Sequence, residues 1–193
     1  SEWIADQARI VLEDMPVHAF KIGVLGSVEA IVTIAEVVAD YPNIPLVLDP
    51  VLASGRGDSF ANEEILQAMR DLLFPQTTII TPNSLEARRL TQENEEDPEI
   101  FNLGESAKSF LRMGCQYVLI TGTHENTSKV INTLYDKNGV VRADEWQRLP
   151  GIFHGSGCTL SSAISATLAH GMSVSEGVYE AQDYTWNTLK SGF

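Results

Sequence analysis

Apolar runs of strand length alternate with segments of helical periodicity along most of this chain, and that alternation constrains its fold more than any other feature. Strand-like runs are expected at 17–22, 45–48, 77–81 and 117–121. Helices are expected at 2–14, 27–39, 62–73, 84–90 and 103–113. This order is typical of a mainly parallel sheet covered by helices on its faces.

The pattern changes after residue 121. Two further strand-like runs, 130–135 and 140–146, flank an Asn138-Gly139 pair, which favours the positive φ angles of a tight turn. We therefore expect an antiparallel hairpin at the edge of the parallel sheet. The last two helices are expected at 158–170 and 175–190, with Gly171 ending the first of them. A chain of 193 residues fits one domain, so we expect a single domain over 1–193.

Composition excludes several classes of partner. Acidic residues outnumber basic ones by 26 to 13, and no run of Lys or Arg could follow a nucleic-acid backbone. We expect neither nucleic acid nor membrane as a partner. Two cysteines, Cys115 and Cys158, make no disulfide framework, and with four histidines they make no metal pattern. No stretch approaches the length of a membrane span and no signal sequence opens the chain, which favours a cytoplasmic location.

One segment, His154-Gly155-Ser156-Gly157-Cys158-Thr159, lies where a loop turns into an apolar helix. Small residues leave the first amide N–H groups of such a helix unobstructed, and its dipole favours phosphate oxygens or a developing anion there. The same position lowers the pKa of a cysteine and favours its reactive thiolate. The segment matches neither the Walker A loop nor the dinucleotide fingerprint. A glycine-rich cap followed by a buried, inert cysteine is the alternative.

Polar residues follow the predicted parallel strands, at the sheet edge where ligands bind in open α/β folds. They are Asp49, Asn83, Glu86, Thr121 and Gly122. Two carboxylates beside an anion-binding helix suggest a hydrated Mg²⁺ bridging to phosphates, because this ion takes few protein carboxylates. Phosphoryl transfer needs mainly positioning and charge neutralisation, which this set supplies. Alternatively, Asp49 only caps a turn, and Asn83 only caps the next helix with Glu86 in its first turn.

Three segments together resemble one family of kinases. They are Val47-Leu48-Asp49-Pro50-Val51-Leu52-Ala53-Ser54-Gly55, Thr81-Pro82-Asn83-Ser84-Leu85-Glu86-Ala87 and His154-Gly155-Ser156-Gly157-Cys158-Thr159-Leu160-Ser161. Their order and spacing resemble ribokinase-like kinases, and more narrowly the hydroxymethylpyrimidine/phosphomethylpyrimidine kinases of thiamine biosynthesis, which are relatives of pyridoxal kinases. The resemblance runs from about Val17 to the C-terminus.

This resemblance implies a ribokinase-like three-layer α/β/α fold, ATP as co-substrate and Mg²⁺ as cofactor. The implied reaction phosphorylates a hydroxymethylpyrimidine and then its monophosphate. Two alternatives stay open: a pyridoxal or pyridoxine kinase, and a catalytically silent ligand-binding protein on the same fold.

The resemblance also implies roles for individual residues. They are Asp49 and Glu86 for the metal, Asn83, Thr121 and Gly122 for ATP, Gly155, Ser156 and Gly157 for the anion hole, Cys158 for catalysis, Val24 for the substrate, and helix 175–190 for the adenine. Cys158 either accepts the proton of the substrate hydroxyl as a thiolate or positions that hydroxyl while the phosphate takes the proton.

Three departures from the family pattern are visible. Family members begin with a strand and a Gly-Ser-Asp segment that contribute to the substrate pocket, and nothing here corresponds to them, so we expect an N-terminally incomplete domain. Val24 stands where a methionine often follows Lys-Ile-Gly, and Thr121-Gly122-Thr123-His124 replaces Lys-Gly-Gly-His, which predicts weaker contact with the ATP phosphates. Strands left exposed by a missing segment favour pairing with a second copy, so we expect a homo-oligomer, a dimer.

Overall fold

The computed structural model describes residues 2–53, 61–91, 102–151 and 153–192. The helices are α1 (Glu2–Asp14), α2 (Val28–Ala39), α3 (Glu63–Ala68), α4 (Ser84–Thr91), α5 (Leu103–Arg112), α6 (Ser156–Ala169) and α7 (Val174–Ser191). The strands are β1 (Phe20–Ile22), β2 (Leu46–Leu48), β3 (Ile79–Ile80), β4 (Tyr117–Thr121), β5 (Lys129–Asp136) and β6 (Gly139–Gln147). A π-helical turn, η1 (Met69–Leu73), and a 3-10 turn, η2 (Phe74–Gln76), follow α3.

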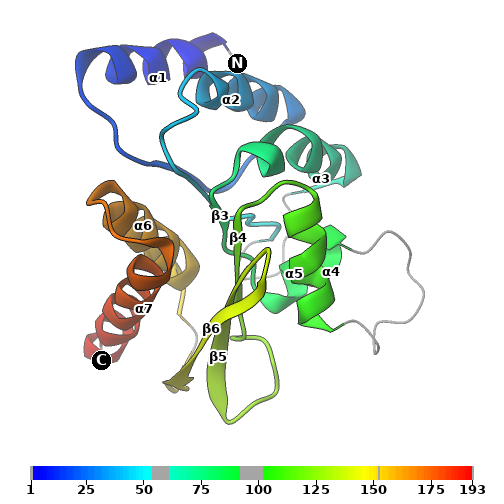
Figure 1. Cartoon of the computed structure of the whole chain (residues 1–193), viewed down its shortest axis with the longest axis vertical. Coiled ribbons are helices and arrows are strands. Elements are labelled where there is room, and N and C mark those ends of the chain that lie inside the picture. Colours follow the sequence, from blue (N-terminus) through cyan, green and yellow to red (C-terminus); the bar gives the residue numbers. More distant parts are fainter. Residues whose placement is uncertain (1, 54–60, 92–101, 152, 193) are drawn as a thin grey trace.

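The strands form one sheet in the order in which they occur along the chain, with β1 to β4 parallel and β5 and β6 antiparallel (Figure 1). The predicted hairpin is confirmed, and Gly139 in its turn has a φ of 118°. β1 is the edge strand at one side of the described sheet and β6 at the other. The carboxyl ends of the four parallel strands therefore meet at one edge, where the predicted site residues lie.

Alternation along the strands divides the core into two layers. One set of strand side chains packs against α2 to α5, and it includes Leu48 and Ile80. The other set packs against α6 and α7, and it includes Val47, Ile79 and Leu119. All five are fully buried. The predicted three-layer α/β/α architecture is confirmed, because each face of the sheet has its own helices.

Several predicted boundaries were wrong. The runs at 17–22 and 77–81 form strands only at Phe20–Ile22 and Ile79–Ile80. The helix expected at 62–73 widens into η1, and the wider turn brings both Leu73 and Phe74 into the core, where they are fully buried. The helix expected from residue 158 begins at Ser156, because Gly155, with a φ of 83°, is its N-cap.

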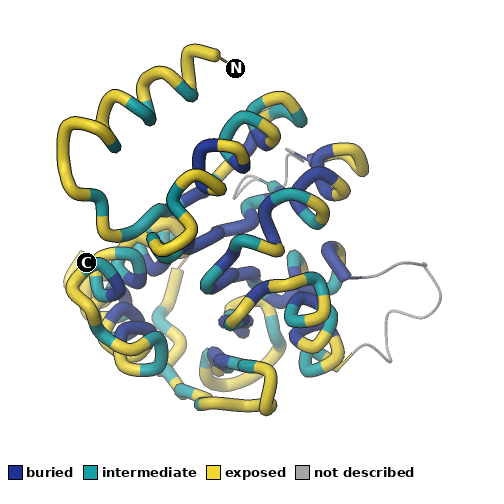
Figure 2. The backbone as a smooth tube through the Cα atoms, turned by 45° about the horizontal axis from the view of Figure 1, so that its top comes forward, coloured by how far each residue is buried: buried dark blue, intermediate teal, exposed yellow. Residues whose placement is uncertain are grey.

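Helix α1 lies outside these two core layers, against α2, and none of its residues is buried (Figure 2). An ion pair at 2.7 Å between Arg9 and Asp40 links α1 to the end of α2. Among the described residues, no helix combines the length and the apolar character that a membrane crossing requires.

Candidate active site

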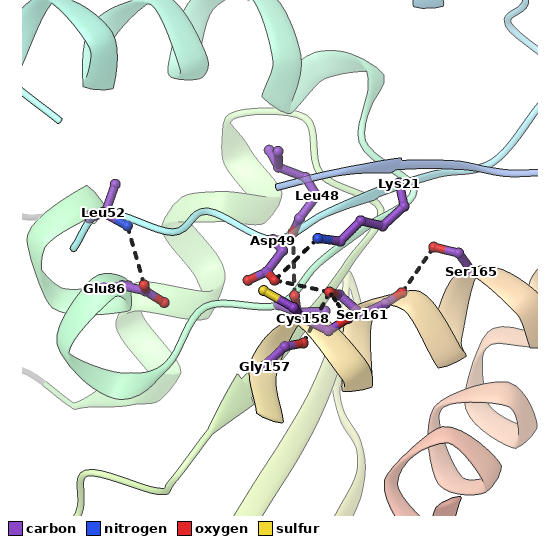
Figure 3. A network of polar contacts seen from close by, with 10 residues as sticks. Lys21, Leu48, Asp49, Leu52, Glu86, Gly157, Cys158, Ser161 and Ser165 are labelled. Atoms are coloured by element: carbon purple, nitrogen blue, oxygen red, sulfur yellow. Dashed lines mark hydrogen bonds and ion pairs between the residues drawn. The ribbon is translucent and has the colours of Figure 1, made fainter. Parts of the chain in front are cut away.

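Asp49 follows β2 directly and is held at the sheet edge by its backbone. Its N–H donates to the carbonyl of Ile22 at the end of β1, at 2.9 Å. The residue is only 4% exposed, and the Oδ2 of its side chain accepts a hydrogen bond of 3.0 Å from the Ser161 hydroxyl on α6 (Figure 3). Lys21 Nζ lies 3.6 Å from the same oxygen. Asp49 therefore joins β1, β2 and α6.

The ionisation of Asp49 is set by opposing effects. Burial raises the pKa of this carboxyl above its ordinary value. The Lys21 charge counters that rise most strongly, followed by the Ser161 hydroxyl, and a hydrogen bond with the Cys158 side chain also lowers the pKa of Asp49.

Asn83 and Glu86 form a reciprocal cap at the start of α4. Asn83 Oδ1 accepts the N–H of Glu86 at 2.9 Å, and Glu86 Oε2 accepts the N–H of Asn83 at 2.9 Å. The N–H of Leu52, from the segment after β2, reaches Glu86 Oε1 at 3.4 Å. The capping role that sequence left open is confirmed, and the same cap fixes the Glu86 carboxyl beside the chain that leaves β2.

Burial raises the pKa of Glu86 to about 7, against the opposing effect of the two backbone N–H groups that it accepts. The charge of Asp49 adds to this rise. The two carboxyls are thus close enough to interact electrostatically, and Figure 3 shows both in one close view with Cys158. A site that holds two such groups favours a bound cation, because a cation relieves their mutual repulsion.

The N-terminus of α6 completes the cluster. Gly155 makes no side-chain cap, and its carbonyl accepts the N–H of Thr159 at 2.8 Å, so the earlier N–H groups belong to the uncapped first turn. Ser156 and Gly157 are therefore the first two residues of the helix. Cys158 is exposed, which contradicts the alternative of a buried, inert cysteine. Cys115 is the buried one, and burial raises the pKa of its thiol.

Thr121 ends β4 next to the cap of α4, and Gly122 follows it. Thr121 forms a parallel bridge with Asn83, and its N–H donates to the carbonyl of Pro82 at 3.0 Å. The N–H of Gly122 donates to Asn132 Oδ1 at 3.1 Å and is already used within the fold. A Cβ at Gly122 would overlap the carbonyl oxygen of Ile131, so the glycine is needed for the close approach of β5.

Hydrogen bonds from two arginines hold the segment that follows β4 in place. Arg148 donates to the carbonyls of Thr123 at 2.8 Å and Glu125 at 3.0 Å. Arg88 on α4 makes a two-bond contact with the Glu125 carboxylate, at 2.9 and 3.1 Å. The position where the family pattern has Lys-Gly-Gly-His is therefore fixed between α4 and the chain that leads to α6.

Val24 and helix α7 are the remaining predicted site elements. Val24 lies two residues beyond β1 and is 54% exposed. Helix α7 packs against α6 and β6. Its Gln182 accepts hydrogen bonds from Asn132 at 2.9 Å and Trp146 at 3.0 Å. A cavity of about 870 Å³ lies between α2, α3 and the residues just before them, and none of the predicted site residues lines it.

Sequence reasoning missed Lys21 and Ser161. Ser161 is recognisable only in retrospect, as a hydroxyl three positions after Cys158 on the helix face that meets β2. Lys21 is the one charged residue of β1, and that is the signal that could have marked it. Across the described ranges, no three His, Cys, Asp or Glu side chains gather as a metal site.

Comparison with known proteins identifies the family. A family model described as phosphomethylpyrimidine kinase matches residues 1–193. This chain belongs to that family. A hydroxymethylpyrimidine/phosphomethylpyrimidine kinase of Streptomyces coelicolor is 34% identical over 100% of this chain and 70% of its own length. The thiamine biosynthesis bifunctional protein ThiED of Geobacter sulfurreducens is 34% identical over 94% of this chain, which spans only 37% of that protein.

Solved structures agree with this assignment at the level of the fold. The structure of Bacillus subtilis pyridoxal kinase in complex with ADP superposes with a TM-score of 0.82 at 32% identity, covering 95% of this chain and 67% of that one. The ribokinase-like fold is thereby confirmed for this member of the phosphomethylpyrimidine kinase family.

Proposed function

We propose that this chain carries the active site of a kinase that transfers the γ-phosphoryl group of ATP to a hydroxymethylpyrimidine, and then phosphorylates the monophosphate. The main structural support is the contact between α6 and the end of β2, where the Ser161 hydroxyl donates a hydrogen bond of 3.0 Å to Asp49. That contact brings the uncapped first turn of α6 to the buried Asp49 carboxyl, which interacts electrostatically with the partly buried Glu86. Family membership supports the substrate class, because the family is described as phosphomethylpyrimidine kinase.

The N–H groups of the first turn of α6 are suited to hold the transferring phosphoryl group. These are the N–H groups of Ser156, Gly157 and Cys158. The N-cap residue, Gly155, has no side chain that could accept their hydrogen bonds. Charge on the phosphoryl oxygens is spread over several atoms during transfer, so preorganised N–H donors stabilise the transition state without reorganisation.

The two carboxyls fit a hydrated Mg²⁺. Asp49 is buried, Glu86 is partly buried, and the pKa values of both are raised, which means that each loses solvation as an anion and gains from a cation nearby. When bound, the ion would neutralise charge on the β- and γ-phosphates. Asp49 would face it from β2 and Glu86 from the cap of α4, with waters and phosphates completing its coordination.

Cys158 positions the hydroxyl in this proposal. Its side chain is exposed on the first turn of α6 beside Asp49, where the sulfur can accept a hydrogen bond from the substrate O–H. The hydroxyl oxygen then forms its bond to the γ-phosphorus as the bond to the β-bridging oxygen of ATP breaks. The proton leaves on the transferred phosphoryl group and ADP departs. Of the two roles weighed from sequence, we propose positioning, because phosphoryl transfer depends mainly on positioning and charge stabilisation.

The first test incubates the protein with ATP, Mg²⁺ and hydroxymethylpyrimidine and follows products by mass spectrometry. We expect the monophosphate and then the diphosphate. Cys158→Ala should lower kcat by roughly 10- to 100-fold. Cys115→Ala is the matched control, because Cys115 lies in the core away from the site and its loss should leave kcat unchanged. Equal kcat in the two variants would refute the role of Cys158.

A pyridoxal kinase is the second candidate, favoured by the TM-score of 0.82 to the Bacillus subtilis enzyme. The same assay with pyridoxal decides between the two, since turnover of pyridoxal alone would move the assignment. A silent binding protein is the third candidate. Calorimetry would show ligand binding with no ATP consumption if that candidate is right.

A further inference from the structure

Lys21 lies in a row of sheet residues whose other members are apolar. It pairs with Val47 on β2, which pairs with Ile79 on β3, and this row faces α6 and α7. Val47 and Ile79 are both 0% exposed. A lysine in such a row loses hydration of its ammonium group, and this cost is tolerated only where the charge meets a partner.

The partner is the carboxylate that follows β2. Lys21 Nζ lies 3.6 Å from Asp49 Oδ2, the same oxygen that the Ser161 hydroxyl donates to (Figure 3). The lysine side chain is 24% exposed and that of Asp49 is 6% exposed, so Lys21 is the more solvent-accessible member of the pair. In the described part of the chain, Asp49 is the one acidic partner of Lys21.

Gly23 provides the space that the ammonium occupies. A Cβ at Gly23 would lie 2.8 Å from Lys21 Nζ, closer than such contacts occur. The φ of Gly23 lies outside the left-handed region, so its backbone does not require glycine. What the missing side chain provides is room for Lys21. The displaced atom would be the end of a flexible side chain, so an alanine at Gly23 would move the ammonium without disturbing the fold.

We propose that Lys21, held in place by the space at Gly23, is a phosphate-site residue whose ammonium offsets the Asp49 charge and favours the γ-phosphate of the bound nucleotide. This inference rests on the proposed function. Two carboxylates beside an anion-binding helix repel the same phosphate that the helix attracts, and Lys21 is the cation placed to reduce that repulsion. In the bound state, as Asp49 faces the divalent cation, the ammonium pairs with phosphate oxygens.

The experiment compares nucleotides rather than turnover. Calorimetry measures the Kd of a methylene-bridged ATP analogue and of ADP, both with Mg²⁺, for the whole protein and its Lys21→Met and Gly23→Ala variants. We expect both variants to bind the triphosphate analogue more weakly, about tenfold for Lys21→Met, which is the effect of one lost charge several ångströms away in partly solvated surroundings. ADP affinity should change less than threefold.

Gly26→Ala is the matched control. Gly26 has open space around its Cβ position, has no left-handed φ, and lies three residues from Gly23, so its substitution should leave both Kd values unchanged. Thermal unfolding of every variant checks the fold, and Gly23→Ala keeps the test valid should Lys21→Met fail to fold.

The outcomes separate the two claims. If the wild-type protein binds the triphosphate analogue more tightly than ADP and both variants keep that preference, the role of Lys21 is refuted. The proposed function would still stand. Wild-type protein with no affinity for either nucleotide would overturn the proposed function, and the inference about Lys21 would fall with it.

Discussion

The two carboxyls of the candidate site follow neighbouring strands, yet they are held in different ways. Glu86 accepts backbone N–H groups, one from Asn83 in its own cap and one from Leu52. Asp49 meets side chains from β1 and α6, those of Lys21 and Ser161. Glu86 is thus placed largely by local sequence, whereas Asp49 depends on elements more than 100 residues apart, since the Ser161 contact spans 112 positions.

The largest expected effect comes from the carboxyl with side-chain partners. Asp49→Asn should lower kcat by about 100-fold or more, because the site loses the charge that faces the cation and Lys21 loses its partner. Steady-state kinetics with hydroxymethylpyrimidine measure this. Asp6→Asn, on the exposed face of α1, is the control and should retain wild-type kcat. An Asp49→Asn protein whose kcat stays within threefold of wild type would show that the Asp49 carboxylate and its side-chain contacts are not needed for catalysis.

The second effect concerns stability and pH at Glu86. The folded state raises the pKa of Glu86 from 4.5 to about 7, so it holds this proton more tightly than the unfolded chain. The contribution of Glu86 to the free energy of unfolding is therefore largest at low pH and is lost as pH rises from about 4.5 to about 7. In full, this amounts to roughly 3 kcal/mol.

Urea unfolding of wild type and Glu86→Gln at pH 5 and pH 8, without Mg²⁺, tests this sign. The wild-type protein should lose more stability than the variant between the two pH values, because glutamine does not titrate. The difference between the two proteins in this pH-dependent loss of stability reports on Glu86 alone, because the other carboxyls titrate in both proteins. A variant with the same pH dependence as wild type would contradict the raised pKa.

The smallest effect concerns the cap that holds Glu86. Asn83→Ala should lower the free energy of unfolding by about 1 kcal/mol, because the N–H of Glu86 loses its acceptor. Asn102→Ala removes the equivalent cap of α5, where Asn102 accepts the N–H of Gly104 at 2.9 Å. Both variants should lose similar stability by urea unfolding, but only Asn83→Ala should also lose kcat, because only that cap positions a site carboxyl. Equal kcat in the two variants would show that the Asn83 cap does not position Glu86 for catalysis.

The same contrast explains which predictions from sequence held. The Asn83-x-x-Glu86 cap depends on residues three positions apart, so its spacing was visible in the sequence. The hairpin was visible because Asn138-Gly139 fixes a local turn. The short strands and the η1 turn were not, because their ends are set by packing, such as the burial of Leu73 and Phe74, rather than by local periodicity.

By itself, the sequence determined the order of strands and helices, the cap at Asn83 and the glycine-rich start of α6, because each depends on residues within one turn or one strand. Only the tertiary structure decided that Lys21 and Ser161 meet on one oxygen of Asp49, with the room at Gly23 that keeps the ammonium there. The physical reason is burial. A carboxyl that loses its water must find partners in space, and sequence spacing does not reveal which distant side chains will supply them.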